Sequence, residues 1–344
     1  MKKIILSLGI LLAVGIILFI LINNAKSNTS AFDKQEQAIA SVTPMPFEEL
    51  TIPALRRRNY SSELGELTTV SSNSEYTSYS TNYTSDGLKI NGQLTIPKGD
   101  RPISGWGAIV FVHGYIPPST YQTFQNYSSY VDYLARHGFV VFKIDLRGHG
   151  ESEGEPGGAY YSADYIIDVL SARTALQRTD FVDPEKIGLW GHSMAGNVVL
   201  RSMAVMPEIP AGVIWGGAVF TYDDWKKYGI DDGSYQPPTD ATNRQRRRQQ
   251  LLEKYGQFDK ESPFWSKFAA TNYINDIKGA IQLAHAIDDN VVNIGYSRDL
   301  NTLLDSTPVV HELKEYPSGG HNFTGETFNQ AMQSSVDFFS QTLK

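Results

Sequence analysis

The chain has 344 residues, of which 41% are apolar and 19% are charged, so it can bury a large core, which excludes disordered chains and mini-protein scaffolds. Its formal net charge of −7, without a long basic block, argues against nucleic acid as a partner. Cysteine is absent, which excludes disulfide frameworks, thiolate nucleophiles and cysteine-ligated metal sites.

The first expected element is an apolar helix at the N-terminus. Lys2 and Lys3 precede residues 4–22, where only one serine and two glycines interrupt aliphatic side chains and one phenylalanine. A helix of this length spans about 28 Å, close to the thickness of a bilayer core. Residues 1–22 therefore predict a single-pass anchor in the cell membrane, or alternatively a signal segment that is cleaved to give a secreted protein. The lysines before the run predict that the remaining chain lies on the extracytoplasmic side.

Residues 23–83 form the second expected segment, and they are polar. Of the 27 residues from 59 to 85, 16 are serine, threonine or asparagine. Such a composition is too polar to carry a core of its own, so we interpret this segment as a stalk or N-terminal extension.

Residues 84–344 alternate between strand-like and helix-like patterns. We expect helices at 121–137, 163–177, 196–206, 293–304 and 327–342, and strands at 88–96, 106–112, 139–144, 187–190, 212–220, 280–286 and 309–316. Strands that alternate with helices predict an α/β fold with a mostly parallel central sheet and helices on both faces. In such a sheet the chemistry takes place at the carboxyl ends of the strands.

One interruption of this pattern, at about residues 221–271, is longer than a connection between two elements needs, and we interpret it as a lid insertion. The segment is polar and charged, and it carries a cluster of four arginines, Arg244, Arg246, Arg247 and Arg248. Two interpretations stay open for this cluster: a solvated helix face, or a clamp for an acidic group of a substrate.

Ser193 follows a predicted strand and precedes a predicted helix. A serine on such a sharp turn adopts strained backbone geometry, and it needs small neighbours two residues away on either side. Gly191 and Ala195 occupy these two positions, and Gly196 follows directly. The pattern predicts a nucleophile elbow, with the serine hydroxyl presented at the edge of the sheet.

A serine becomes nucleophilic when a base takes its proton and an acid orients that base. His321 lies in a glycine-rich loop after the last predicted strand, and we interpret it as the base. The acid is expected after the preceding strand, where Asp288 and Asp289 are consecutive. The order serine, acid, histidine along the chain is the order found in serine hydrolases of this architecture.

The developing negative charge of an acyl-transfer reaction requires backbone N–H donors. We expect these donors to be the N–H groups of Met194, at the start of the helix, and Tyr115, in the loop after the strand at 106–112. His113 and His192 flank these two loops, and we interpret both as residues that hold the loops in place.

Five motifs together resemble one family: His113-Gly114-Tyr115, the loop 145–152, the elbow 191–196, the run 288–291 and Gly320-His321. They are similar to the catalytic domain of the prolyl oligopeptidase (S9) family, with its dienelactone-hydrolase-like and esterase relatives, in the α/β-hydrolase superfamily. The resemblance covers residues 84–344. It implies an α/β-hydrolase fold, and it implies that Asp288 rather than Asp289 completes the triad.

The expected activity is therefore that of a serine hydrolase that cleaves peptide bonds through an acyl-enzyme, with Ser193, Asp288 and His321 as its triad. Hydrolysis of small carboxylic esters is the first alternative, because the same triad serves both reactions. A catalytically inactive surface binding module is the second. The expected partners are a small peptide or ester and the membrane, and we expect neither a cofactor nor a metal.

Overall fold

The computed structural model describes residues 45–219, 221, 223–231 and 243–343. The chain divides into two compact units, residues 1–48 and 49–344, and the fold below is that of the second unit. The predicted anchor at 1–22 and the first part of the predicted stalk, 23–44, lie outside the described residues. In the part of the chain that is described, no helix combines the length and the apolar character needed to cross a bilayer.

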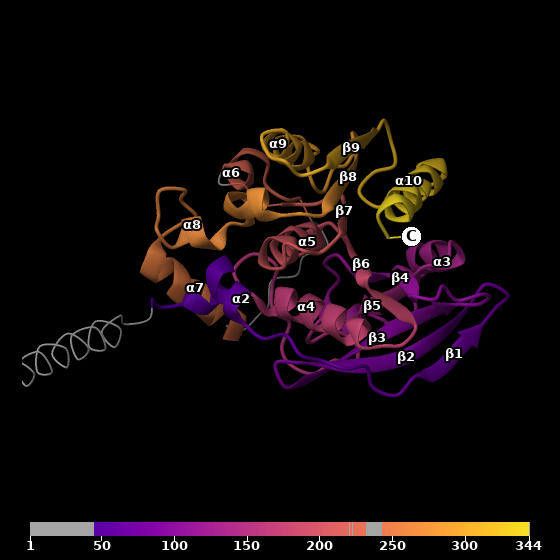
Figure 1. Ribbon diagram of the computed structural model, residues 1–344. Coiled ribbons are helices and arrows are strands. Elements are labelled where there is room, and N and C mark those ends of the chain that lie inside the picture. Colours follow the sequence, from indigo (N-terminus) through magenta and orange to yellow (C-terminus); the bar gives the residue numbers. More distant parts are fainter. Residues whose placement is uncertain (1–44, 220, 222, 232–242, 344) are drawn as a thin grey trace, which may run out of the picture. The chain divides into compact units, whose positions relative to one another are not determined.

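A nine-stranded sheet runs through the molecule in the order β1-β2-β3-β5-β4-β6-β7-β8-β9 (Figure 1). The six strands from β4 to β9 are parallel to one another, and β1, β2 and β3 extend the sheet in antiparallel pairs. The strands are β1 (Thr68–Ser72), β2 (Tyr76–Ser85), β3 (Leu88–Pro97), β4 (Trp106–Val112), β5 (Val140–Ile144), β6 (Val182–His192), β7 (Ala211–Trp215), β8 (Ala280–Ala286) and β9 (His311–Tyr316).

Helices cover both faces of this sheet, as Figure 1 shows. One face carries α3 (Ser128–Arg136) and α10 (Glu326–Leu343), whose apolar residues form a common core with the odd-numbered residues of β4 and β7. The other main helices are α4 (Asp164–Gln177), α5 (Met194–Val205) and α9 (Gly295–Leu304). The remaining elements are η1 (Glu48–Leu50), α2 (Ile52–Arg57), η2 (Pro118–Thr120), α6 (Asp224–Tyr228), α7 (Asn243–Tyr255), α8 (Trp265–Phe268) and η3 (Ala270–Asp276).

The predicted α/β architecture with a mostly parallel sheet is confirmed. Strands β5 and β7 are buried at every residue, and β4 is buried at all but its first. A parallel strand that is covered on both faces needs apolar side chains on both, so these strands are apolar in the sequence, with Lys143 of β5 as the one charged residue. This is why the pattern of the sequence located them.

The predicted stalk is wrong for residues 68–83, which form β1 and most of β2 in the sheet. The hydroxyl of Tyr83 donates to the backbone oxygen of Asp168 at 2.9 Å, and Ser85 donates to the Asp168 carboxylate at 2.6 Å. Both side chains are buried. Serine and threonine fit a pleated strand, so a polar composition did not exclude a strand whose partners lie far away in the chain.

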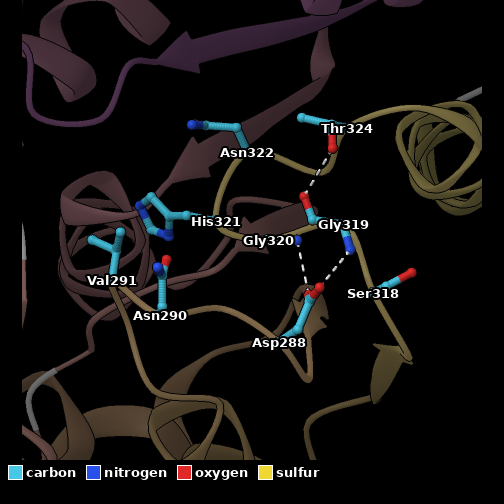
Figure 2. A pocket seen from close by; sticks show the side chains of 9 residues that line it. All are labelled: Asp288, Asn290, Val291, Ser318, Gly319, Gly320, His321, Asn322 and Thr324. Carbon is cyan, nitrogen blue, oxygen red and sulfur yellow. Dashed lines mark hydrogen bonds between the residues drawn. The ribbon is translucent and has the colours of Figure 1, made fainter.

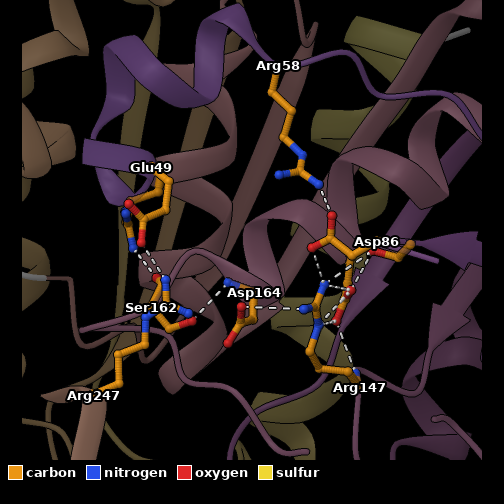
Figure 3. Close-up of polar contacts among 10 residues, drawn as sticks. Glu49, Arg58, Asp86, Arg147, Ser162, Asp164 and Arg247 are labelled. Atoms are coloured by element: carbon orange, nitrogen blue, oxygen red, sulfur yellow. Dashed lines mark hydrogen bonds and ion pairs between the residues drawn. The ribbon is translucent and has the colours of Figure 1, made fainter. Parts of the chain in front are cut away.

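The insertion between β7 and β8 exists, and its described parts include α6, α7 and α8. Two of its arginines bind other parts of the protein: Arg247 pairs with Glu49 at 2.6 Å (Figure 3), and Arg248 lies over the ring of Tyr161, 4.6 Å from its centroid. Arg246 donates to Asn243 within the same helix. These contacts attach α7 to its neighbours, and they do not favour an arginine clamp for a substrate.

Arg147 joins the loop after β5 to α4 and to the β2–β3 turn (Figure 3). Its guanidinium donates to the fully buried carboxylate of Asp168 at 2.7 Å, and it also reaches Asp86 at 3.2 Å and Asp164 at 3.4 Å. The Asp168 carboxylate additionally accepts from the Arg147 backbone N–H at 3.0 Å. This ion-pair network fixes the loop 145–152, which follows a strand that ends at the same edge of the sheet as β6.

We expect Arg147→Met to lower the free energy of unfolding by roughly 3–5 kcal/mol, because it leaves the Asp168 carboxylate buried without a counter-charge. The matched control is Arg178→Met, which removes an exposed ion pair with Glu63 and should cost less than about 1 kcal/mol. Urea denaturation of both variants measures the difference. Equal midpoints for the two variants would contradict the role given to Arg147.

Candidate active site

Ser193 lies at the turn between β6 and α5 and has φ 57° and ψ −120°. This left-handed backbone is rare for a residue with a side chain. It is held by three backbone hydrogen bonds, one of them from the Ala218 N–H to the Ser193 oxygen at 3.3 Å. The Ser193 N–H donates to the Trp215 oxygen at 2.8 Å, and the Ser193 oxygen accepts from the Gly196 N–H at 2.9 Å. The strained elbow predicted from the sequence is therefore present in the structure.

Close packing explains the small residues of the elbow. A Cβ on Gly191 would lie 2.7 Å from a methyl of Val199, and a Cβ on Gly196 would lie 2.8 Å from Gly217. Ala195 is fully buried. These contacts leave no room for larger side chains, so the turn brings Ser193 to the sheet edge only with small neighbours.

His321 is oriented by Asp289 and not by Asp288, which corrects the choice made from the resemblance. Its Nδ1 lies 2.8 Å from Asp289 Oδ2, and the Asp289 side chain is only 1% exposed. The other carboxylate oxygen, Oδ1, accepts from the N–H groups of Val291 and Val292, each at 2.9 Å. The turn after β8 thus directs the second of the two consecutive carboxylates toward the histidine.

Asp288 contacts the histidine loop in a different way (Figure 2). Its carboxylate accepts from the backbone N–H of Gly320 at 2.8 Å and from that of Gly319 at 3.3 Å. Asp288 is exposed, whereas Asp289 is buried. Asp288 therefore holds the backbone of the loop that carries His321, and Asp289 contacts the imidazole itself.

The Asp289 carboxylate is stabilised in its charged form. Burial by itself raises the pKa of an aspartate, but hydrogen bonds from His285 and His321 hold the pKa of Asp289 well below its usual value. The carboxylate is therefore ionised at neutral pH, as an acid that orients a histidine must be.

His192, beside the elbow, ties three loops together. Burial, and next the charge of His321, lower the pKa of His192 to about 3, so its ring is neutral. Its Nε2 lies 2.8 Å from the backbone oxygen of His321, and its Nδ1 lies 2.7 Å from the Tyr127 hydroxyl. That hydroxyl also accepts from the Gly114 N–H at 3.1 Å. The prediction that His192 holds loops agrees with these contacts.

His113 holds the backbone of its own loop. Its Nδ1 lies 2.7 Å from the Gly114 oxygen, and burial keeps the pKa of His113 well below its usual value. A neutral, fully buried imidazole at this position cannot reach a substrate, in agreement with the structural role predicted for it.

A cavity of about 580 Å³ brings the predicted nucleophile and base together. None of the described residues that line it is an aspartate, glutamate, lysine or arginine. The lining residues are Tyr115, Ile116, Asn126, Tyr127, Tyr130, His192, Ser193, Val291, His321 and Asn322. A second cavity, of about 560 Å³, shares Val291, His321 and Asn322 with the first and is lined mainly by polar groups (Figure 2).

The predicted oxyanion donors occupy the expected elements. Tyr115 lines the cavity that contains Ser193, and Met194 is the first residue of α5. Backbone N–H groups in the first turn of a helix have no acceptor within the helix, which suits them to bind a developing negative charge. The roles of these two N–H groups remain a prediction.

Two residues that contact the site were missed in the sequence. Tyr127 has φ 59°, and nothing in its local pattern marks it as the link between Gly114 and His192. His285 lies within the predicted strand 280–286, and its side chain is 3.2 Å from Asp289. A histidine four residues before the acid, in a strand that is otherwise apolar except for Gln282, was a usable signal.

The chain is similar to known proteins over part of its length. Residues 106–231 match the family described as serine aminopeptidase, S33. One curated relative, "Thiohydrolase aneE" of Aspergillus aculeatus, is 34% identical over 119 residues, which are 33% of this chain and 33% of that protein. The match thus spans about a third of the length of that relative.

Two solved structures show the same fold over most of the chain. Acetyl xylan esterase 1 of Thermoanaerobacterium sp. has a TM-score of 0.57 and 20% identity, covering 86% of this chain and 94% of that one. Dipeptidyl peptidase 4 of Porphyromonas gingivalis has a TM-score of 0.57 and 20% identity, covering 78% of this chain and 36% of that one. The chain has the α/β-hydrolase fold, and the comparisons support a serine hydrolase of esterase or peptidase type.

Proposed function

We propose that this α/β hydrolase is a serine hydrolase that cleaves small, uncharged carboxylic esters, with Ser193, His321 and Asp289 as its triad. The main support for this proposal is the cavity that Ser193 and His321 share, with His321 paired to Asp289. Among the described residues that line this cavity, none is an aspartate, glutamate, lysine or arginine. Tyrosine and aliphatic side chains in that lining suit an apolar acyl group.

In the proposed reaction, Ser193 attacks the carbonyl carbon of the ester while His321 accepts the proton of its hydroxyl. Because Nδ1 of His321 is held by Asp289, Nε2 is the nitrogen that exchanges protons with Ser193. The N–H groups of Tyr115 and Met194 stabilise the oxyanion. His321 then protonates the leaving alcohol, and water repeats the sequence to release the acid.

A peptide substrate is the second candidate, and the match to a family described as serine aminopeptidases favours it. An aminopeptidase binds the charged amino terminus of its substrate next to the scissile bond. Binding an ammonium group in a pocket without a carboxylate costs free energy, because the charge loses water and gains no partner. The uncharged lining of the cavity that contains Ser193 therefore favours an ester.

A substrate panel tests this proposal. We expect kcat/KM for small acyl esters to exceed that for aminoacyl and Xaa-Pro amides by at least a hundredfold. A fluorophosphonate, which reacts with an activated serine, should label the wild-type protein. A higher kcat/KM for the amides than for the esters would contradict the ester proposal and support a peptidase. Absence of both labelling and turnover would support the inactive binding module.

We also propose, from the sequence of residues 1–22, that the protein is anchored in the cell membrane with its catalytic domain on the extracytoplasmic side. Alkaline carbonate extraction, which removes peripheral proteins, should leave the full chain in the membrane fraction. A chain that lacks residues 1–22 should appear in the soluble fraction. Extraction of the full chain by carbonate would contradict the anchor.

A further inference from the structure

A second imidazole contacts the Asp289 carboxylate. His285 lies on β8, four residues before Asp289, and its side chain is fully buried. Its Nε2 is 3.2 Å from Asp289 Oδ2 and 2.8 Å from the backbone oxygen of Val292. Its Nδ1 is 2.7 Å from the hydroxyl of Ser297, on α9. The same carboxylate oxygen that pairs with His321 therefore also faces His285.

These partners determine which ring nitrogen carries hydrogen. Nε2 of His285 faces only acceptors, the Val292 oxygen and the Asp289 carboxylate, so it must donate. The Ser297 hydroxyl can donate a hydrogen bond, and it satisfies the lone pair of Nδ1 in the neutral ring. The surroundings thus select one tautomer, with the hydrogen on Nε2.

The charges near His285 come from several elements. Glu315, its cross-strand neighbour on β9, is paired with Arg298 of α9 at 2.7 Å. His321 contacts the other side of the shared carboxylate oxygen, and His192, at the end of β6, is a further electrostatic neighbour. Asp289 is the carboxylate that His285 contacts directly, so an effect of His285 on catalysis should pass through Asp289.

We propose that His285 is a positioning residue for acyl transfer: its Nε2–H holds Asp289 Oδ2 in the orientation that pairs with His321, and Ser297 selects the tautomer that makes this possible. The proposal rests on the proposed function, because it assigns His285 to the same triad. One oxygen of this carboxylate accepts from the Val291 and Val292 N–H groups, and the other lies 2.8 Å from Nδ1 of His321 and 3.2 Å from Nε2 of His285, so the carboxylate has little freedom to rotate.

The test is His285→Leu, which keeps a similar volume and removes the donor. A hydrogen bond to a charged group contributes about 1.5–3 kcal/mol, so we expect kcat to fall roughly 10- to 100-fold with KM unchanged. With one donor fewer, the Asp289 charge attracts the protonated form of His321 more strongly. The acid limb of the kcat/KM profile should therefore move to higher pH.

Two matched variants separate positioning from structural damage. His285→Gln keeps an N–H donor at a similar distance and should retain activity within a few-fold of wild type. In an Asp289→Asn background, His285→Leu should cost little further activity, because its effect passes through that carboxylate. An unchanged kcat, or an acid limb that moves to lower pH in a folded His285→Leu protein, would overturn the proposal.

A measurement on the unaltered protein covers the case in which His285→Leu does not fold. The ¹⁵N chemical shifts of His285 should report hydrogen on Nε2 and none on Nδ1, and hydrogen on Nδ1 would overturn the proposal. Fluorophosphonate labelling of the wild type keeps the two proposals apart. A wild-type protein that is neither labelled nor active defeats the proposed function. An active wild-type protein whose kcat is unchanged by His285→Leu defeats only this inference.

Discussion

Ser193→Ala is expected to lower kcat/KM for the best ester of the panel by about 10⁶-fold, because no other group can form the acyl-enzyme. The backbone of Ser193 is held by hydrogen bonds to Trp215 and Gly196, and alanine keeps both. The variant should therefore fold and melt like the wild type. Hydrolysis rates and thermal denaturation, measured on the same preparation, check both halves of this expectation.

A serine further along α5 offers a matched control. Ser202 lies nine residues after Ser193, about two and a half helical turns, and is fully buried, so its removal does not touch the cavity. The fluorophosphonate should still label the Ser202→Ala protein, and it should not label the Ser193→Ala protein. If Ser193→Ala retained appreciable turnover, a different nucleophile would be at work, and the assignment of the triad would fall.

Asp289→Asn is expected to lower kcat by roughly 10⁴-fold, whereas Asp288→Asn should cost only a few-fold. The amide nitrogen of an asparagine at position 289 would donate toward His321, which favours the wrong tautomer of the base. The Asp288 carboxylate accepts from backbone N–H groups of the histidine loop, and an asparagine keeps an acceptor oxygen there.

Steady-state kinetics of the two variants distinguish the consecutive aspartates directly. Both substitutions are isosteric, so a difference in kcat reports which side chain orients the base rather than a difference in volume. A large loss in Asp288→Asn with little loss in Asp289→Asn would restore the choice implied by the family resemblance. Similar thermal stability of the two proteins is the control.

The elements that position the site were predictable because each has a local signature. Strands β4 and β8 occur at the predicted residues, since β4 is an apolar run and β8 is apolar apart from Gln282 and His285. The elbow is recognisable because its small residues are a steric requirement at fixed spacing from Ser193. The glycines before His321 likewise mark a loop, but the histidine in it pairs with Asp289 and not with the expected Asp288.

The choice between Asp288 and Asp289 was not predictable from residue types, because both stand at the expected place after the strand. It depends on the conformation of the turn, in which the N–H groups of Val291 and Val292 bind one oxygen of Asp289 and the other oxygen contacts His321, 32 residues further along the chain. The same limit applies to β2, whose polar side chains find their partner, Asp168, some 85 residues away. Contacts with distant segments contribute to both features, and composition does not report such contacts.

The incorporation of residues 68–85 in the sheet sets where the catalytic unit can be shortened. Tyr83 is 1% exposed and β2 pairs with β3 along ten residues, so a truncated protein that starts at residue 84 would uncover β3 and lose the Tyr83 hydroxyl that donates to the backbone oxygen of Asp168. A protease that released an intact enzyme from a membrane would likewise have to cut upstream of α2, whose Ile52 and Leu55 are buried.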